Sequence, residues 1–143
     1  MFLRLVRETP QPLTLGTPIR GPLDALAVLR PAFEGQEVES FLILALDAQH
    51  RLIGNAPIEI TRGLLNFSLV HAREVYRSAI AANAAAIVLA HNHPSGDATP
   101  SADDKKVTDM LVQSGKLLDI PVHDHVIIGR GATFLSFAES GLL

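Results

Sequence analysis

Cysteine and tryptophan are both absent from this chain of 143 residues. The absence of cysteine excludes disulfides, thiolate metal ligands and a thiol nucleophile, so any metal ion would have to be bound by His, Asp or Glu. Aromatic residues make up only 5% of the chain and charged residues 19%. Hydrophobic residues, at 48%, are still numerous enough to argue against disorder. We therefore expect one compact domain.

Positive charge is also scarce. The net charge is −3, and the nearest approach to a basic run is Lys105-Lys106, which directly follows Asp103 and Asp104. Proteins that bind nucleic acids usually concentrate positive charge on one face, because phosphate contacts supply most of their affinity. The composition therefore gives no support to a nucleic-acid partner, unless a basic patch assembles in three dimensions.

Long hydrophobic segments are missing as well. The apolar N-terminal stretch 1–6 is interrupted by Arg4 and followed by Arg7 and Glu8, so it falls short of a signal peptide. The longest later apolar run, 84–90, is too short to cross a bilayer. We expect a cytoplasmic protein without a membrane partner, and the sequence does not indicate its oligomeric state.

Hydrophobic patterning predicts an α/β domain with a mixed central sheet. The helices are expected at 24–33, 72–83 and 101–118. The strands are expected at 41–46, 51–60, 86–90, 122–128 and 133–137, with the second as an antiparallel partner of the first. The continuous apolar run AIVLA at 86–90 indicates a central strand covered on both faces. Residues 1–38, a proline-rich lead-in with one short helix, are assigned to the same domain as 39–143.

Each predicted helix has an apolar side that is expected to face the core. In the first helix the apolar residues are Leu23, Leu26, Val28 and Leu29. In the second they are Tyr76, Ala79 and Ile80, and in the third Val107, Met110, Leu111, Leu117 and Leu118.

The most informative segment is HNHPSGDATPSADD, residues 91–104, which follows the predicted central strand. His91 and His93 are two residues apart, so an extended chain projects both imidazoles to one side. A turn containing proline and glycine leads into the next helix, whose first turn carries Asp104. Two histidines and one carboxylate would leave the fourth position of a tetrahedral zinc ion open to water, as in catalytic zinc sites.

Such an ion would lower the pKa of its bound water toward about 7 and would polarise a carbonyl group. A separate carboxylate would take the proton and pass it to the leaving amine. Ser101 could donate a hydrogen bond to the oxyanion that forms. These residues would then act together as a hydrolase site.

A simpler interpretation exists for part of this segment. Ser101-x-x-Asp104 also matches a helix capping box, and an isolated H-x-H pair is weak evidence for a metal. If Asp104 serves only as a cap, Asp97 and Asp103 are the nearest substitutes. The combination of H-x-H at a strand end with a capped helix that carries an acid favours the metal site, and capping is compatible with metal binding.

The same residues match the JAMM signature of MPN-domain metallopeptidases, which is H-x-H, seven residues and then S-x-x-D. The surrounding sequence resembles the RadC family, whose members carry HNHPSGD followed by PS and an acidic pair. Further similarity lies in REV at 73–75, DHVIIG at 124–129 and SF at 136–137. The resemblance extends from about Glu39 to Phe137.

The resemblance implies the MPN fold, with a mixed sheet flanked by helices and layered as in cytidine deaminases. It also implies a metallopeptidase that binds Zn²⁺ and cleaves an amide bond in a peptide or isopeptide substrate. The implied zinc ligands are His91, His93 and Asp104, with Ser101 as the oxyanion partner. The implied general base is Glu39, which matches the family's E-x-F…L-D pattern.

Sequence alone does not choose Glu39 over Glu37, Glu59 or Glu74 as the base, and an ordinary charged strand end is the competing interpretation.

Asn92 and His125 are candidates to hydrogen-bond a metal ligand, and His125 lies in the family's DH pair. A satisfied strand histidine is the alternative for His125. The other two histidines considered, His71 and His123, are expected at the surface or beside a helix.

Longer RadC proteins carry an N-terminal region that resembles helix-hairpin-helix DNA-binding modules, and this chain is too short to hold it. A RadC-type DNA-repair accessory or nucleic-acid-processing role is therefore the alternative hypothesis. A non-catalytic binding module is a third hypothesis, which the complete ligand set disfavours.

Overall fold

The computed structural model describes residues 16–63 and 70–143, so the start of the predicted lead-in lies outside the described residues. The described residues form three helices and five strands. The helices are α1 (Pro22–Phe33), α2 (Ala72–Ala81) and α3 (Ala102–Leu118). The strands are β1 (Ser40–Leu46), β2 (Ile58–Arg62), β3 (Ala86–Asn92), β4 (Val122–Ile128) and β5 (Phe134–Ser136). None of these helices is long and apolar enough to span a membrane. The predicted α/β class is confirmed.

The five strands form one sheet in the order β2-β1-β3-β4-β5. The β3–β4 pair is parallel and the other three pairs are antiparallel, so the sheet is mixed, as predicted. Because β1 and β3 are antiparallel, with Phe41 opposite His91, the start of β1 lies beside the end of β3. This register brings the segment before Phe41 next to the histidine pair.

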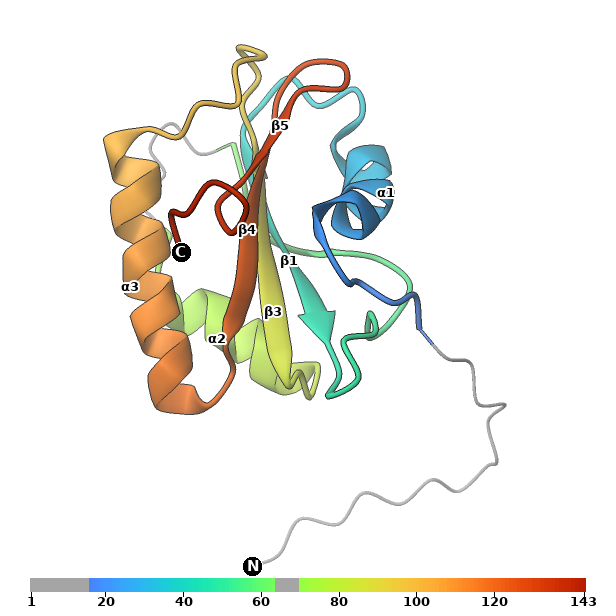
Figure 1. Cartoon of the computed structure of the whole chain (residues 1–143), viewed down its shortest axis with the longest axis vertical. Coiled ribbons are helices and arrows are strands. Elements are labelled where there is room, and N and C mark those ends of the chain that lie inside the picture. The colour runs from blue at the N-terminus through green and yellow to red at the C-terminus, as the bar shows by residue number, and fades with distance from the viewer. Residues whose placement is uncertain (1–15, 64–69) are drawn as a thin grey trace, which may run out of the picture.

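Helices cover both faces of the sheet, with α1 on one side and α2 and α3 on the other (Figure 1). A hydrophobic layer lies between the sheet and the helices on each face, and alternate residues of β1 contribute to the two layers. Leu42 and Leu44 pack on the α1 side, while Phe41 and Ile43 pack on the opposite side. Every residue of β1 and β3 is buried. Burial on both faces explains why these strands are continuously apolar rather than alternating.

The predicted strand 51–60 is wrong over most of its length. The second strand begins only at Ile58, and before it Arg51 and Leu52 form no more than isolated bridges, to Pro18 and Leu46. A turn-rich segment with Gly54 at φ 80° interrupts the pairing between them.

Four apolar residues that were expected on core-facing sides are exposed instead: Leu23, Ile80, Leu117 and Leu118. In α3 the buried side consists of Val107, Thr108, Leu111 and Gly115, together with Asp104 in the first turn. Leu117 follows Leu111 by six residues, which rotates it by about 240° around a helix of 3.6 residues per turn. The predicted Val107 and Leu111 do lie on the inner face, but the rest of that face is a threonine and a glycine rather than Leu117 and Leu118.

Gly115 allows α3 to approach its neighbours closely. A Cβ atom at Gly115 would lie 2.5 Å from the hydroxyl of Tyr76 and 2.5 Å from the carbonyl oxygen of Ile120. The Tyr76 hydroxyl donates to the carbonyl oxygen of Leu111 at 2.7 Å, which ties α2 to α3. The glycine is therefore required by packing.

We expect Gly115→Ala to destabilise the domain, although alanine ordinarily stabilises a helix interior by about 1 kcal/mol relative to glycine. The two short contacts would force a shift that costs about 1–3 kcal/mol, the usual range for overpacking. Thermal or urea unfolding measures the change. Gln113→Ala, at an exposed position of the same helix, serves as the control. A Gly115→Ala variant at least as stable as the wild type would contradict the packing argument.

Candidate metal centre

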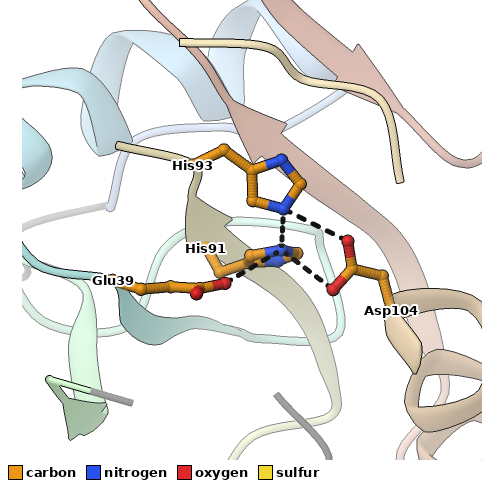
Figure 2. A group of neighbouring side chains, drawn as sticks. All are labelled: Glu39, His91, His93 and Asp104. Carbon is orange, nitrogen blue, oxygen red and sulfur yellow. Dashed lines mark hydrogen bonds and ion pairs between the residues drawn. The ribbon is translucent and has the colours of Figure 1, made fainter. Parts of the chain in front are cut away.

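Four side chains converge at the edge of the sheet where β3 ends (Figure 2). His91 lies on β3 and His93 directly follows it. Glu39 immediately precedes β1, and Asp104 lies in the first turn of α3. Their nearest ligand atoms all lie within 4.8 Å of one another, so the four residues form a candidate metal-binding group.

The contacts within this cluster are short and involve the same imidazole nitrogens. Nε2 of His91 lies 2.9 Å from Nε2 of His93, and it lies 3.4 Å from Oδ1 of Asp104. Nε2 of His93 lies 3.1 Å from Oδ2 of Asp104. The Oε1 atom of Glu39 is 3.8 Å from Nε2 of His91. His91 and Asp104 are buried, whereas His93 and Glu39 are partly exposed.

A chain of hydrogen bonds behind His91 determines which of its nitrogens carries the proton. The Thr108 hydroxyl donates to the carbonyl oxygen of Asp104 at 2.6 Å, so its oxygen accepts from Nδ1 of His125 at 2.6 Å. Nε2 of His125 then accepts from Nδ1 of His91 at 2.7 Å. Burial lowers the pKa of His125 well below its ordinary value, which keeps this ring neutral. Because Nδ1 of His91 carries the proton in this series of hydrogen bonds, the lone pair of its Nε2 is directed at the cluster.

His93 is oriented by the loop that follows it. Its Nδ1 donates to the carbonyl oxygen of Asp97 at 2.8 Å, which leaves Nε2 for the cluster. The carboxylate of Asp97 accepts instead from the backbone and hydroxyl groups of Thr99. Asp97 therefore contributes through its backbone, and its carboxylate is not part of the four-residue group.

The donor set fits a divalent cation. Two Nε2 lone pairs that face each other at 2.9 Å beside a carboxylate repel one another unless a proton or a metal ion lies between them. The hydrogen bond to Asp104 raises the pKa of His93, because a proton on that ring relieves this repulsion. Burial opposes ionisation of Asp104, but the nearby imidazoles of His91 and His93 outweigh that effect and lower its pKa. The cluster is thus built to hold positive charge, as a two-histidine, one-carboxylate site requires.

The first turn of α3 is a capping box, so the capping interpretation of Ser101 and Asp104 is confirmed. The backbone nitrogen of Asp104 donates to Oγ of Ser101 at 3.0 Å, and the backbone nitrogen of Ser101 donates to Oδ2 of Asp104 at 2.8 Å. Asp104 nevertheless reaches both histidines. The cap holds its carboxylate in place for the cluster.

Asn92 hydrogen-bonds the chain around Glu39 on both sides. Its Oδ1 accepts from the backbone nitrogen of Ser40 at 2.7 Å, and its Nδ2 donates to the carbonyl oxygen of Val38 at 3.0 Å. The side chain is buried and bridges the end of β3 to the start of β1. Its amide thus orients the segment of the glutamate, whereas it was expected to contact a metal ligand.

The other candidates lie apart from the four-residue group. Glu37, Asp103 and His71 are exposed, and Glu59 pairs with Arg62 at 2.7 Å. His123 packs against His50 with ring centroids 4.7 Å apart. Thr108 was not among the predicted site residues, although its position one helical turn after Asp104 was a usable signal.

We expect Thr108→Val to weaken zinc binding by about 10- to 100-fold, the usual effect of removing a partner that orients a ligand. Valine keeps the shape but removes the oxygen that accepts from His125, so the hydrogen-bond chain no longer specifies the proton position on His91. Chelator competition measures the affinity, and ¹⁵N NMR of the imidazoles reports the tautomers. Thr108→Ser, which keeps the hydroxyl, should have the wild-type zinc affinity and the wild-type tautomers. Wild-type affinity in Thr108→Val would contradict the proposed proton positions.

A comparison with known protein families agrees with this geometry. The family model described as RadC-like JAB domain matches residues 19–142 of the chain. The match begins before Glu39, where the resemblance found in the sequence begins, so it also includes α1. The mixed sheet with helices on both faces is consistent with a JAB/MPN domain. The chain belongs to the RadC-like JAB domain family.

Proposed function

We propose that the chain is a zinc-dependent hydrolase that cleaves an amide bond with water. The observation that carries the proposal is the convergence of two imidazole nitrogens and one carboxylate beside a second, partly exposed carboxylate. His91, His93 and Asp104 would hold the ion, and Glu39 would remain outside its ligand set. Membership of the JAB domain family supports a metal-dependent hydrolase of this type.

Zinc is the ion that best suits these ligands. Catalytic zinc sites commonly use three protein ligands drawn from His, Asp and Glu and keep one position open. When bound, zinc supplies a Lewis acid that acidifies water and polarises a carbonyl group. All other parts of the reaction would fall to side chains of the chain.

Glu39 is the proposed general base. Burial raises the pKa of its carboxyl group, while the nearby His93 lowers it. A raised pKa brings the carboxylate closer to the proton affinity that a base needs near neutral pH. Glu39 would take a proton from the attacking water and pass it to the amine that leaves. The two hydrogen bonds of Asn92 to the adjacent backbone would hold Glu39 in position.

Ser101 is the proposed donor to the oxyanion. Its oxygen accepts from the backbone nitrogen of Asp104, and this leaves the hydroxyl proton to be donated elsewhere. The side chain is exposed, so a substrate can reach it. One such hydrogen bond typically contributes a factor of about 10²–10³ to kcat in hydrolases.

The proposal is tested by incubating the zinc-loaded chain with a peptide library and identifying new termini by mass spectrometry. We expect Glu39→Gln to keep one zinc per chain and to reduce turnover by at least about 10²-fold, the usual contribution of a general base. Glu37→Gln, which removes the same charge from an exposed site two residues away, should keep both zinc and activity. Undiminished cleavage by Glu39→Gln would show that another group is the base.

A further inference from the structure

We propose that the cleft beside His93 binds a carboxylate group of the substrate through Arg30 and Arg130. This inference rests on the proposed amide hydrolysis, because it assigns the part of the substrate next to the reacting bond. The cleft has a volume of about 510 Å³ and is bordered by His93 and Asn92. A substrate that reaches the metal cluster would therefore extend into it.

The cleft lies between three segments that are distant in the sequence. One wall is the C-terminal end of α1 with the residue that caps it, including Arg30 and Glu34, and another is the β4–β5 turn, including Arg130. The third is the loop after His93, which also carries the histidine into the cluster. The wall formed by this loop thus adjoins the metal cluster, where the proposed reaction takes place.

The charge of the cleft is opposite to that of the metal cluster. Two guanidinium groups and one carboxylate border it. Within residues 16–63 and 70–143, neither Arg30 nor Arg130 forms an ion pair with a carboxylate. Arg30 donates to the backbone oxygen of Gly131, which fixes its side chain across the cleft. The positive charge of both groups is therefore still available to an anionic ligand.

Arg130 is held against the loop that carries His93. Its backbone nitrogen donates to the carbonyl oxygen of Gly96 at 3.0 Å. Its side chain lies across Gly96, where a Cβ atom would come within 2.9 Å of the Cβ of Arg130 and 3.2 Å of its Nε. Gly96 therefore permits an approach that a larger residue would prevent. The exposed side chain of Arg130 thus lies beside the loop that carries His93, where its charge can meet a ligand in the cleft.

A carboxylate suits this arrangement better than a nucleic-acid backbone. Guanidinium groups bind carboxylates through two parallel hydrogen bonds, and such charged bonds are among the strongest in proteins. A polyanion would also have to approach Glu39 and Asp104 in a chain of net charge −3. We therefore assign the cleft to the carboxylate of a peptide, either a C-terminus or an acidic side chain.

The test is an NMR titration of the full-length chain, metal-free and zinc-loaded, with N-acetylglycine and its neutral analogue N-acetylglycinamide. We expect the acid, and not the amide, to shift the backbone resonances of Gly96 and Gly131. Arg130→Gln should weaken binding of the acid by about tenfold or more, as expected for loss of a charged hydrogen bond. Arg130→Lys should recover part of it.

Arg77→Gln is the matched control, because it removes the same charge from an exposed position on α2, on the opposite side of the sheet from α1 (Figure 1). An equal loss of affinity for the acid in Arg77→Gln and Arg130→Gln would mean that only overall charge matters and would overturn the assignment. If binding of the acid requires zinc and is unchanged in Arg130→Gln, the acid binds to the metal, and the assignment is overturned as well. Tighter, Arg130-dependent binding of a deoxythymidine oligonucleotide at physiological salt would assign the cleft to nucleic acid instead.

These outcomes are separable from failure of the proposed hydrolase, because the metal-free titration needs neither zinc nor turnover. Arg130-dependent binding of the acid without any peptide cleavage would support the cleft and contradict the hydrolase. Conversely, equal cleavage of peptides with C-terminal or side-chain carboxylates and of their amidated counterparts would overturn the cleft alone. A preference for carboxylate-bearing peptides that Arg130→Gln removes would support both.

Discussion

The repulsion between the lone pairs of a buried and a partly exposed imidazole beside a buried carboxylate is the constraint on which this site depends. His91 and His93 direct the same type of nitrogen at each other at 2.9 Å, with Asp104 beside them. Such an arrangement is unfavourable without a cation, and the hydrogen bond to Asp104 raises the pKa of His93, which favours a proton on that ring. Because metal ligands must lose their protons, zinc and protons compete for the same position.

The rest of the fold keeps these groups together. The antiparallel register of β1 and β3 brings Glu39 to the histidines, and the hydrogen bonds of Asn92 reinforce that junction. The capping box fixes Asp104, while buried His125 links β4 and α3 to the back of His91. Together these contacts connect β1, β3, β4 and α3 around the cluster. Local stability and the geometry of the site therefore depend on the same interactions.

Sequence predicted those parts of the site that lie close together along the chain. His91, His93 and Asp104 fall within fourteen residues, and the spacing of a strand end and a helix start already brings them together. Glu39 could be chosen only through a family resemblance, because its proximity depends on strand pairing. The contact between Thr108 and His125 spans two elements, and the two arginines of the cleft are a hundred residues apart along the chain. No local pattern encodes such contacts.

The most direct test of the central claim is the zinc stoichiometry of the purified full-length chain, combined with X-ray absorption at the zinc edge. We predict one zinc per chain with two imidazole nitrogens among its ligands, and loss of that ion in Asp104→Ala. A chain that binds no stoichiometric zinc, or that holds it equally well in Asp104→Ala, would contradict the claim.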